Sequence, residues 1–454
     1  MKKIILLFTS CIVSFTIFAQ SDSLLKKFKY RIDHYRAVTL NASSGGQHGE
    51  ADYPVGTHKY GASSAAVSGN YFTTTSTDKK LLTASVGLNG IFYRAKSQDQ
   101  TSSNTRKNFS SVPNVTILNK WFSKKMFTEL GADILGSFSS SKEVTQGYPV
   151  AAKNNQVNYT ATVTMGIGKG RLENVTDMQN ALWLYKELVN VQRLAGTLSA
   201  TDLLELGQSI TKGNNTRVMD ARKRTQFLLT TVDNYLQQKG LISKTDMAYF
   251  STLNDILFYA YNNPRFAGTE KFIRLIPGVT GVNNNQFQPN SADKSKHLFN
   301  TRSLMLSTGF KKYSPASLSH QNNYGVALNF SYTNADLTDR DFTNGIITNE
   351  LKGKTELKKA GANLFYEHAI YPNTRTNITL NLQTDFGYQN DDARKVYTDA
   401  NLFCNVNYFI SYHTRLTFGA GAFYQRNMYT IGNYVEIKPN SFQLYANGGL
   451  QISL

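Results

Sequence analysis

The stretch that decides the fold is the C-terminal segment Ser441–Leu454, Ser-Phe-Gln-Leu-Tyr-Ala-Asn-Gly-Gly-Leu-Gln-Ile-Ser-Leu. Its alternate residues differ in polarity. The even-numbered ones, from Phe442 to Leu454, are apolar or small, and the odd-numbered ones are mostly polar. Successive side chains of a β-strand point to opposite faces, so the segment predicts a strand with one apolar and one polar face. Such a strand fits a soluble sandwich or a barrel in lipid, and the remaining sequence must decide between them.

The same alternation recurs through most of the chain. It is clear in Leu82–Tyr93 and Met126–Ile134, and with less regular segments it predicts six strands before residue 171. Eight more are expected after residue 264, ending with the C-terminal segment. The connections alternate between long polar stretches, such as Gly45–Lys59 and Asp336–Lys354, and short turns. Long loops on the outer side and short turns on the inner side are typical of transmembrane β-barrels.

The N-terminus has the features of a secretory signal peptide over residues 1–19. Met1-Lys2-Lys3 is a basic start, Ile4–Phe18 is an apolar run too short for a stop-transfer helix, and Ala19 ends a cleavage site. Cleavage would remove two lysines and lower the formal net charge from +18 to +16. Cys404 would then be the only cysteine, so no internal disulfide is expected.

Between the two groups of strands, the sequence has the periodicity of helices. Four amphipathic helices are expected within Asn174–Tyr261, each with a single apolar stripe. Ser199 and Asp202 have the spacing of a capping box at the start of the second helix, and Gly240 is placed to end the third. The segment therefore predicts a small bundle in water, packed against the strands or a partner.

These patterns divide the chain into five parts. Residues 1–19 are the signal peptide, 20–35 a periplasmic lead-in, 36–170 strands 1–6, 171–263 the helical insert and 264–454 strands 7–14. Six strands after a periplasmic start return the chain to the periplasm, and counting back eight strands from the C-terminus gives the same side. The predicted fold is an all-β transmembrane barrel of about 14 antiparallel strands with an inserted α-helical bundle in the periplasm.

The combination resembles uncharacterised Gram-negative outer-membrane β-barrel proteins with a periplasmic helical insert. The motif that opens the insert, Gly-x-Gly-Arg-x-Glu-x-Val-x-Asp, is formed here by Gly168, Gly170, Arg171, Glu173, Val175 and Asp177. The chain end resembles the insertion signal of such barrels through Asn447, Gly449, Ile452 and Leu454, with leucine where phenylalanine is usual. The resemblance implies the cell outer membrane as location, with outer-membrane lipid and the barrel-assembly machinery as partners. It implies no reaction.

If the apolar faces lie toward lipid, the opposite faces line a lumen rich in Asn, Thr, Ser and Gly. Its charged candidates are Glu129, Asp133, Lys359, Glu367, Asp385, Asp399 and Arg415. A barrel of this strand number is wider than an eight-stranded one, so an aqueous path is physically possible. The leading hypothesis is a pore or facilitator for small hydrophilic solutes. The alternative is a non-conducting structural or assembly barrel whose bundle docks a periplasmic partner through residues 174–261.

The protein is not expected to be an enzyme, and no catalytic, metal-binding or cofactor-binding residues are predicted. His48 and His58 are ten residues apart in a Gly- and Ser-rich stretch, and the segment that begins at His320 has no serine at the place that an outer-membrane phospholipase would need. No phosphate loop, dinucleotide fingerprint, zinc motif or nucleophile elbow is present. The positive charge suits anionic lipid head groups or solutes, and nucleic acid is not an expected partner of an exported protein.

Overall fold

The structure is a computed structural model that describes most of the chain. The described residues are 19–452 without 54–55, 99–102, 147–150, 217–220, 260–263, 288–292, 391–393, 412–413, 432–433 and 438–440. Nearly all of the expected signal peptide, residues 1–18, and the terminal Leu454 therefore lie outside the described residues.

One antiparallel sheet of fifteen strands accounts for most of the described residues. Its first strands are β1 (Ile32–Tyr53), β2 (Gly56–Ser76), β3 (Lys80–Gln98), β4 (Ser103–Ser123), β5 (Met126–Thr145) and β6 (Ala152–Asn174). After the helices follow β7 (Phe266–Phe287), β8 (Lys294–Pro315), β9 (His320–Thr343), β10 (Ile346–Asn373), β11 (Thr376–Asn390), β12 (Arg394–Phe409), β13 (Thr414–Ile431), β14 (Tyr434–Ile437) and β15 (Ser441–Ile452).

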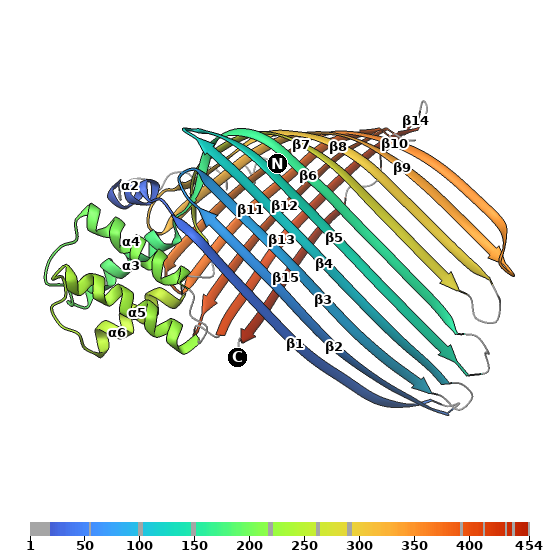
Figure 1. The fold of residues 1–454 in the computed structure, drawn as a ribbon, viewed down its shortest axis with the longest axis horizontal. Coiled ribbons are helices and arrows are strands. Elements are labelled where there is room, and N and C mark those ends of the chain that lie inside the picture. The colour runs from blue at the N-terminus through green and yellow to red at the C-terminus, as the bar shows by residue number, and fades with distance from the viewer. Residues whose placement is uncertain are drawn as a thin grey trace.

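The sheet follows the order of the chain. Each strand from β1 to β14 pairs with its sequence neighbour; β14 covers only the far end of β13, and β15 pairs with the rest of β13. All of these strands except the four-residue β14 have 12 residues or more, which agrees with the expected count of about 14 long strands. Among the described residues, β1 pairs only with β2 and β15 only with β13, so no described pairing closes the sheet. Figure 1 shows the sheet as strongly curved.

The hairpins at the end away from the helices consist mostly of strand, and the prediction of long loops there is wrong. The described part of Gly45–Lys59 belongs to β1 and β2, which pair with each other throughout it. Asp336–Lys354 forms the ends of β9 and β10, joined by the turn Asn344-Gly345 with φ of 50° and 82°. Positive φ at both turn residues matches the twist of the flanking strands. A hairpin with both faces in water can have polar residues at every position. Its sequence then lacks the alternation of a strand and resembles that of a loop.

The described residues form five helices beside the sheet. They are α2 (Ala19–Lys27), α3 (Thr176–Asn190), α4 (Ala200–Asn215), α5 (Ala221–Gln238) and α6 (Met247–Tyr259). Residues 20–35 thus divide between α2 and the start of β1 at Ile32, and β6 continues past the expected boundary at 170. The capping box of Ser199 and Asp202 is confirmed, and Gly240, with a φ of 66°, follows α5 as predicted. None of these helices is long and apolar enough to cross a membrane.

The helices share one apolar core with the residues that precede β1. Leu25 and Phe28 are buried in the same cluster as Met178, Leu206 and Ile210. Full burial of such a side chain contributes about 1.5–3 kcal/mol, so this core holds the start of β1 against α3 and α4. Figure 1 shows the bundle at one end of the sheet, which is the end with the short turns at 77–79, 124–125, 316–319 and 374–375.

Candidate functional site

The two faces of the sheet differ in polarity. On β5, Met126, Leu130 and Ile134 are 51, 48 and 50% exposed, whereas Phe127 and Glu129 between them are buried. We call the face of Glu129 the inner face and the face of Leu130 the outer face. The alternation of the sequence thus corresponds to a real separation of apolar and polar surfaces.

A cluster of four charges lies on the inner face near the bundle. Lys120 of β4 donates a hydrogen bond to Glu270 of β7 at 2.6 Å and lies 3.5 Å from Glu129 of β5. Arg274 of β7 donates through Nε to Glu129 and through Nη2 to Glu270, the latter at 3.2 Å. Charges are tolerated in buried positions when each is paired and hydrogen bonded, and here two cations balance two carboxylates.

Gly166 of β6 allows this cluster to form across an intervening strand. In the pairing register, Gly166 lies between Glu129 of β5 and Arg274 of β7. A Cβ at position 166 would lie 2.5 Å from Oε1 of Glu129 and 3.1 Å from Cγ of Arg274. The missing side chain therefore provides the space through which Arg274 reaches Glu129.

The cluster forms part of the wall of a cavity of about 480 Å³, to which Lys311 of β8 also contributes. Lys120 Nζ lies 4.6 Å from the centre of the Phe127 ring, and Arg274 Cζ lies 3.9 Å from that of Phe272. Aromatic faces attract cations, so these rings help to hold both side chains in place. A catalytic acid or base must be free to exchange a proton with a substrate, whereas each of these four charges is already paired. The cluster is therefore better explained as a polar part of the cavity wall.

A second run of hydrogen bonds follows the sheet from the edge of the bundle. Arg265, which is fully buried, donates to Gln321 at 2.6 Å, and Gln321 donates to Asn323 at 2.7 Å. Asn323 of β9 donates in turn to Glu367 of β10 at 2.6 Å. Hydrogen-bonded polar side chains therefore run from Arg265, directly before β7, through β9 to β10.

The bundle is fixed to strands from both halves of the chain. Asp255 of α6 accepts a hydrogen bond from Arg375 in the turn between β10 and β11 at 2.7 Å. Leu318, in the turn between β8 and β9, packs against the core of the bundle. Helix α2 contacts β7 and β8, and α4 contacts β1. The helices therefore cannot move away from this end of the sheet without breaking several contacts.

The structure brings one of the predicted lumen residues, Glu129, into the charge cluster. The other six are spread along β5 and β10–β13: Asp133, Lys359, Glu367, Asp385, Asp399 and Arg415. Asp133 shares the face of Glu129 and is exposed. Asp385 accepts a hydrogen bond from Asn363 and lies opposite Asp399, while Arg415 Cζ lies 5.7 Å from the Phe409 ring centre. These residues do not form one site.

The predicted insertion signal lies on β15 as far as the structure describes it. Asn447 and Gly449 are opposite Gly419 and Thr417 of β13, and Ile452 ends the strand opposite Thr414. The outer face of β15 exposes its apolar residues, among them Phe442, Leu444 and Leu450. The half-apolar character of this strand is confirmed, and its role in insertion stays a prediction.

Three members of the cluster, Lys120, Glu270 and Arg274, were not predicted from the sequence. Glu270 and Arg274 are four residues apart, so the alternation of β7 places them on one face. The sequence alone therefore indicates that Glu270 and Arg274 share a face. Their meeting with Glu129 depends on the register across β6, which alternation alone does not specify.

No protein-family model matches this chain, and no curated protein does. Several solved structures are similar to it at low scores. The ferric yersiniabactin uptake receptor FyuA of Yersinia pestis is 6% identical over 87% of this chain, with a TM-score of 0.33, and the chain spans 61% of that receptor. The β domain of the Bordetella autotransporter Brka is 8% identical, with a TM-score of 0.26, over 83% of this chain and 100% of that domain.

A third similar structure is OmpT, an outer membrane protein of Vibrio cholerae. It is 7% identical with a TM-score of 0.22, and the match covers 92% of this chain and 99% of OmpT. Similarity at these TM-scores does not establish a shared fold or function. The architecture therefore rests on the strands and pairings described above.

Proposed function

We propose that this protein is an outer-membrane β-barrel that acts as a pore or facilitator for small hydrophilic solutes. The observation that carries the proposal is the difference between the two faces of one continuous sheet. The outer face exposes Leu304, Leu306, Leu328 and Phe330 by 44–50%, and such a surface is stable in lipid rather than in water. The inner face carries the charge cluster and hydrogen-bonded amides, which suit water.

The size of the sheet is compatible with an aqueous interior. With fourteen long strands, a barrel is wider than the eight-stranded kind that side chains fill. β9 and β10 extend well past β11 at the end away from the bundle, and transmembrane barrels reach further on their outer side than on their periplasmic side, so we propose that the helices lie in the periplasm. The proposed role is passage of solutes rather than a reaction, and it requires no cofactor.

Planar-bilayer recording of the refolded full chain tests the proposal. We expect stepwise ion conductance, because a water-filled path through the inner face would admit small ions. Folding is checked beforehand by circular dichroism and by insertion into liposomes. If folded and inserted protein passes no current, the pore hypothesis is wrong. The alternative of a non-conducting structural barrel would then remain.

Cysteine substitution at neighbouring positions of β9 locates the path. In a Cys11→Ser/Cys404→Ser background, Asn329→Cys puts a thiol on the face where Asn329 bonds Asn363, and Phe330→Cys puts one on the outer face. A charged, membrane-impermeant thiol reagent should reduce the current through the Asn329→Cys variant and leave the Phe330→Cys variant unchanged. The reverse pattern, or equal responses, would show that the conducting path does not follow the inner face.

A further inference from the structure

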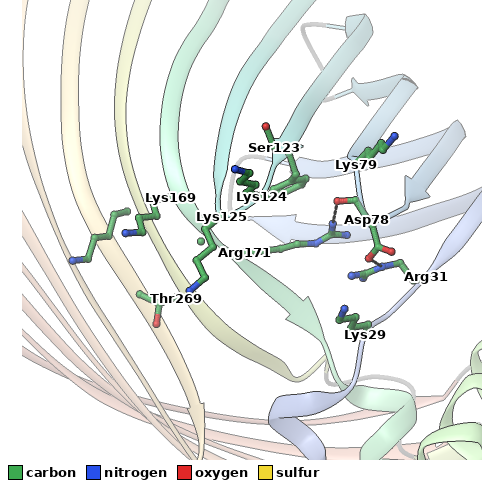
Figure 2. A pocket seen from close by; sticks show the side chains of 13 residues that line it. Lys29, Arg31, Asp78, Lys79, Ser123, Lys124, Lys125, Lys169, Arg171 and Thr269 are labelled. Carbon is green, nitrogen blue, oxygen red and sulfur yellow. Dashed lines mark hydrogen bonds and ion pairs between the residues drawn. The ribbon is translucent and has the colours of Figure 1, made fainter.

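A strongly basic pocket lies at the rim of the sheet beside the bundle (Figure 2). It has a volume of about 940 Å³ and is lined by residues directly before β1, by the β2–β3 and β4–β5 turns and by the adjoining ends of β4, β6 and β7. Eight of its thirteen lining residues are Lys or Arg, and Asp78 is the one carboxylate among them. Such an imbalance attracts anions.

The carboxylates near the pocket are already occupied by its arginines. Arg31 donates to Asp78 at 2.8 Å and to Glu173 at 2.8 Å, and Arg171 lies 3.1 Å from Glu173. Figure 2 shows Arg31 and Asp78 on one side of Arg171, and Lys125 and Lys169 on the other. Four lysines of the pocket form no ion pair with another residue that the structure describes: Lys124, Lys125, Lys169 and Lys271. Their charges are available to a ligand.

Lys169 and Lys271 connect this pocket to an apolar groove on the outer face. They are opposite each other in the β6–β7 register, and both also line a second cavity of about 580 Å³. Ile167 and Ile273, two residues along from each lysine, are 55% and 51% exposed, so the lysines share the outer face with them. The groove is lined mainly by apolar side chains, among them Met126, Ile167, Ile273, Phe310, Val326 and Leu328.

We propose that the pocket and the groove together bind an anionic glycerophospholipid. Its phosphate would lie against Lys169 and Lys271, and its acyl chains would follow the groove. A free phosphate would use only the lysines. A zwitterionic lipid offsets its phosphate with its own cation and depends mainly on the groove, whereas an anionic lipid uses both. Basic side chains beside a lipid-facing surface bind anionic head groups in this way. The inference rests on the proposed function, because the groove meets lipid only if the barrel spans a membrane.

Native mass spectrometry of the full chain in detergent tests the site. The protein is titrated with phosphatidylglycerol and, separately, with phosphatidylcholine of the same acyl chains. We expect phosphatidylglycerol to bind roughly 30-fold more tightly, because two lysines lie near its phosphate. The double variant Lys169→Gln/Lys271→Gln should bind the two lipids alike, because the groove remains and the charges are gone.

A matched control removes the same charge elsewhere. Lys107 and Lys142 are register partners on β4 and β5 at the opposite end of the sheet. The variant Lys107→Gln/Lys142→Gln should keep the preference for phosphatidylglycerol. If both double variants lose it equally, or the unmodified protein shows none, the proposed site is overturned. Displacement of the lipid by millimolar inorganic phosphate would also overturn it, since that identifies a free-anion site.

The same preparations separate this inference from the proposed function. Lys169 and Lys271 lie on the outer face, so the Lys169→Gln/Lys271→Gln variant should still insert into liposomes and conduct ions. If the unmodified protein neither inserts nor conducts, the proposed function fails. If it inserts and conducts but binds both lipids alike, only the lipid site fails.

Discussion

Gly166 determines whether Glu129 and Arg274 can meet, because a side chain there would occupy the space between them. In Gly166→Ala, the added Cβ would lie 2.5 Å from Glu129 Oε1, so the carboxylate must move away from Arg274. Breaking a buried ion pair costs about 3–5 kcal/mol. Because Glu129 can shift and keep part of its bonding, we expect a loss of about 1–3 kcal/mol. Urea unfolding in detergent, followed by circular dichroism, measures it.

The control for this substitution is Gly90→Ala on β3. The atom nearest to a Cβ at position 90 is the carbonyl oxygen of Val67 at 3.9 Å, which is an ordinary contact. This variant should unfold close to the midpoint of the unmodified protein. Equal midpoints for the Gly166→Ala and Gly90→Ala variants would mean that the cluster does not depend on the gap at Gly166.

Asp177 gives the bundle a pH-dependent stability. Burial raises the pKa of this carboxyl from its ordinary 3.8 to about 6, although Thr211 and Asn214 donate hydrogen bonds to it. The folded state then binds the proton more tightly than the unfolded state, so stability is full below about pH 4 and falls as the pH rises to about 6. The difference corresponds to roughly 3 kcal/mol. We expect Asp177→Asn to remove this decline.

Trp183 of α3, which is 4% exposed, reports unfolding of the bundle by its fluorescence in a Trp121→Phe background. The thermal midpoint of the bundle should fall from pH 4 to pH 6 with Asp177 present and stay level in Asp177→Asn. Asp202 affects stability at lower pH. Hydrogen bonds from Ser199 and Lys239 lower its pKa to about 2, so its contribution to the stability of the bundle is lost only below about pH 4. A midpoint that rises between pH 4 and pH 6 would contradict the assignment to Asp177.

Among the elements, α6 has an exposed apolar edge that favours the alternative function, docking of an envelope partner. Met247 is 84% exposed and Phe250, one turn further on, is 41% exposed, whereas Leu253 and Leu257 are buried in the core. The bond between Asp255 and Arg375 fixes the helix to the sheet, so the edge has a defined position. Exposed apolar groups that are held in place often mark a protein partner site.

Replacing this edge tests the docking role. Met247→Ser combined with Phe250→Ser should reduce cross-linking of the protein to periplasmic partners in intact cells, and the bundle should stay folded because its core is unchanged. Val189→Ser provides the control, since Val189 is 47% exposed on a different helix, α3. Equal cross-linking in all three proteins would remove the reason to assign docking to α6.

Helix boundaries could be predicted from the sequence and hairpin lengths could not. Ser199, Asp202 and Gly240 act within a few residues of themselves, through a capping box and a positive φ, so the chain carries these signals locally. The hairpin around Asn344-Gly345 is different, because its strands are held by pairing with each other rather than by one apolar face. Its polar composition therefore predicted a loop.

For the molecule as a whole, alternation predicted the sheet and the number of long strands, but not the candidate site. Glu129 was assigned to the inner face correctly. Its contact with Lys120 and Arg274 joins residues far apart in the sequence across three strand pairings, and one residue of slip in any pairing would separate them. The lipid site has the same origin, since Lys169 and Lys271 meet only through the β6–β7 register.

If the sheet spans a membrane, the length of its strands has a consequence outside the bilayer. β9 and β10 have 24 and 28 residues, while about 9–11 residues cross a bilayer. At about 3.3 Å per residue, the excess is roughly 45 Å along β9 and roughly 60 Å along β10. In an outer membrane, these hairpins would project beyond the lipid head groups as ordered, hydrogen-bonded sheet. Antibodies, phage and neighbouring cells would meet its tips before they reached the cell surface itself.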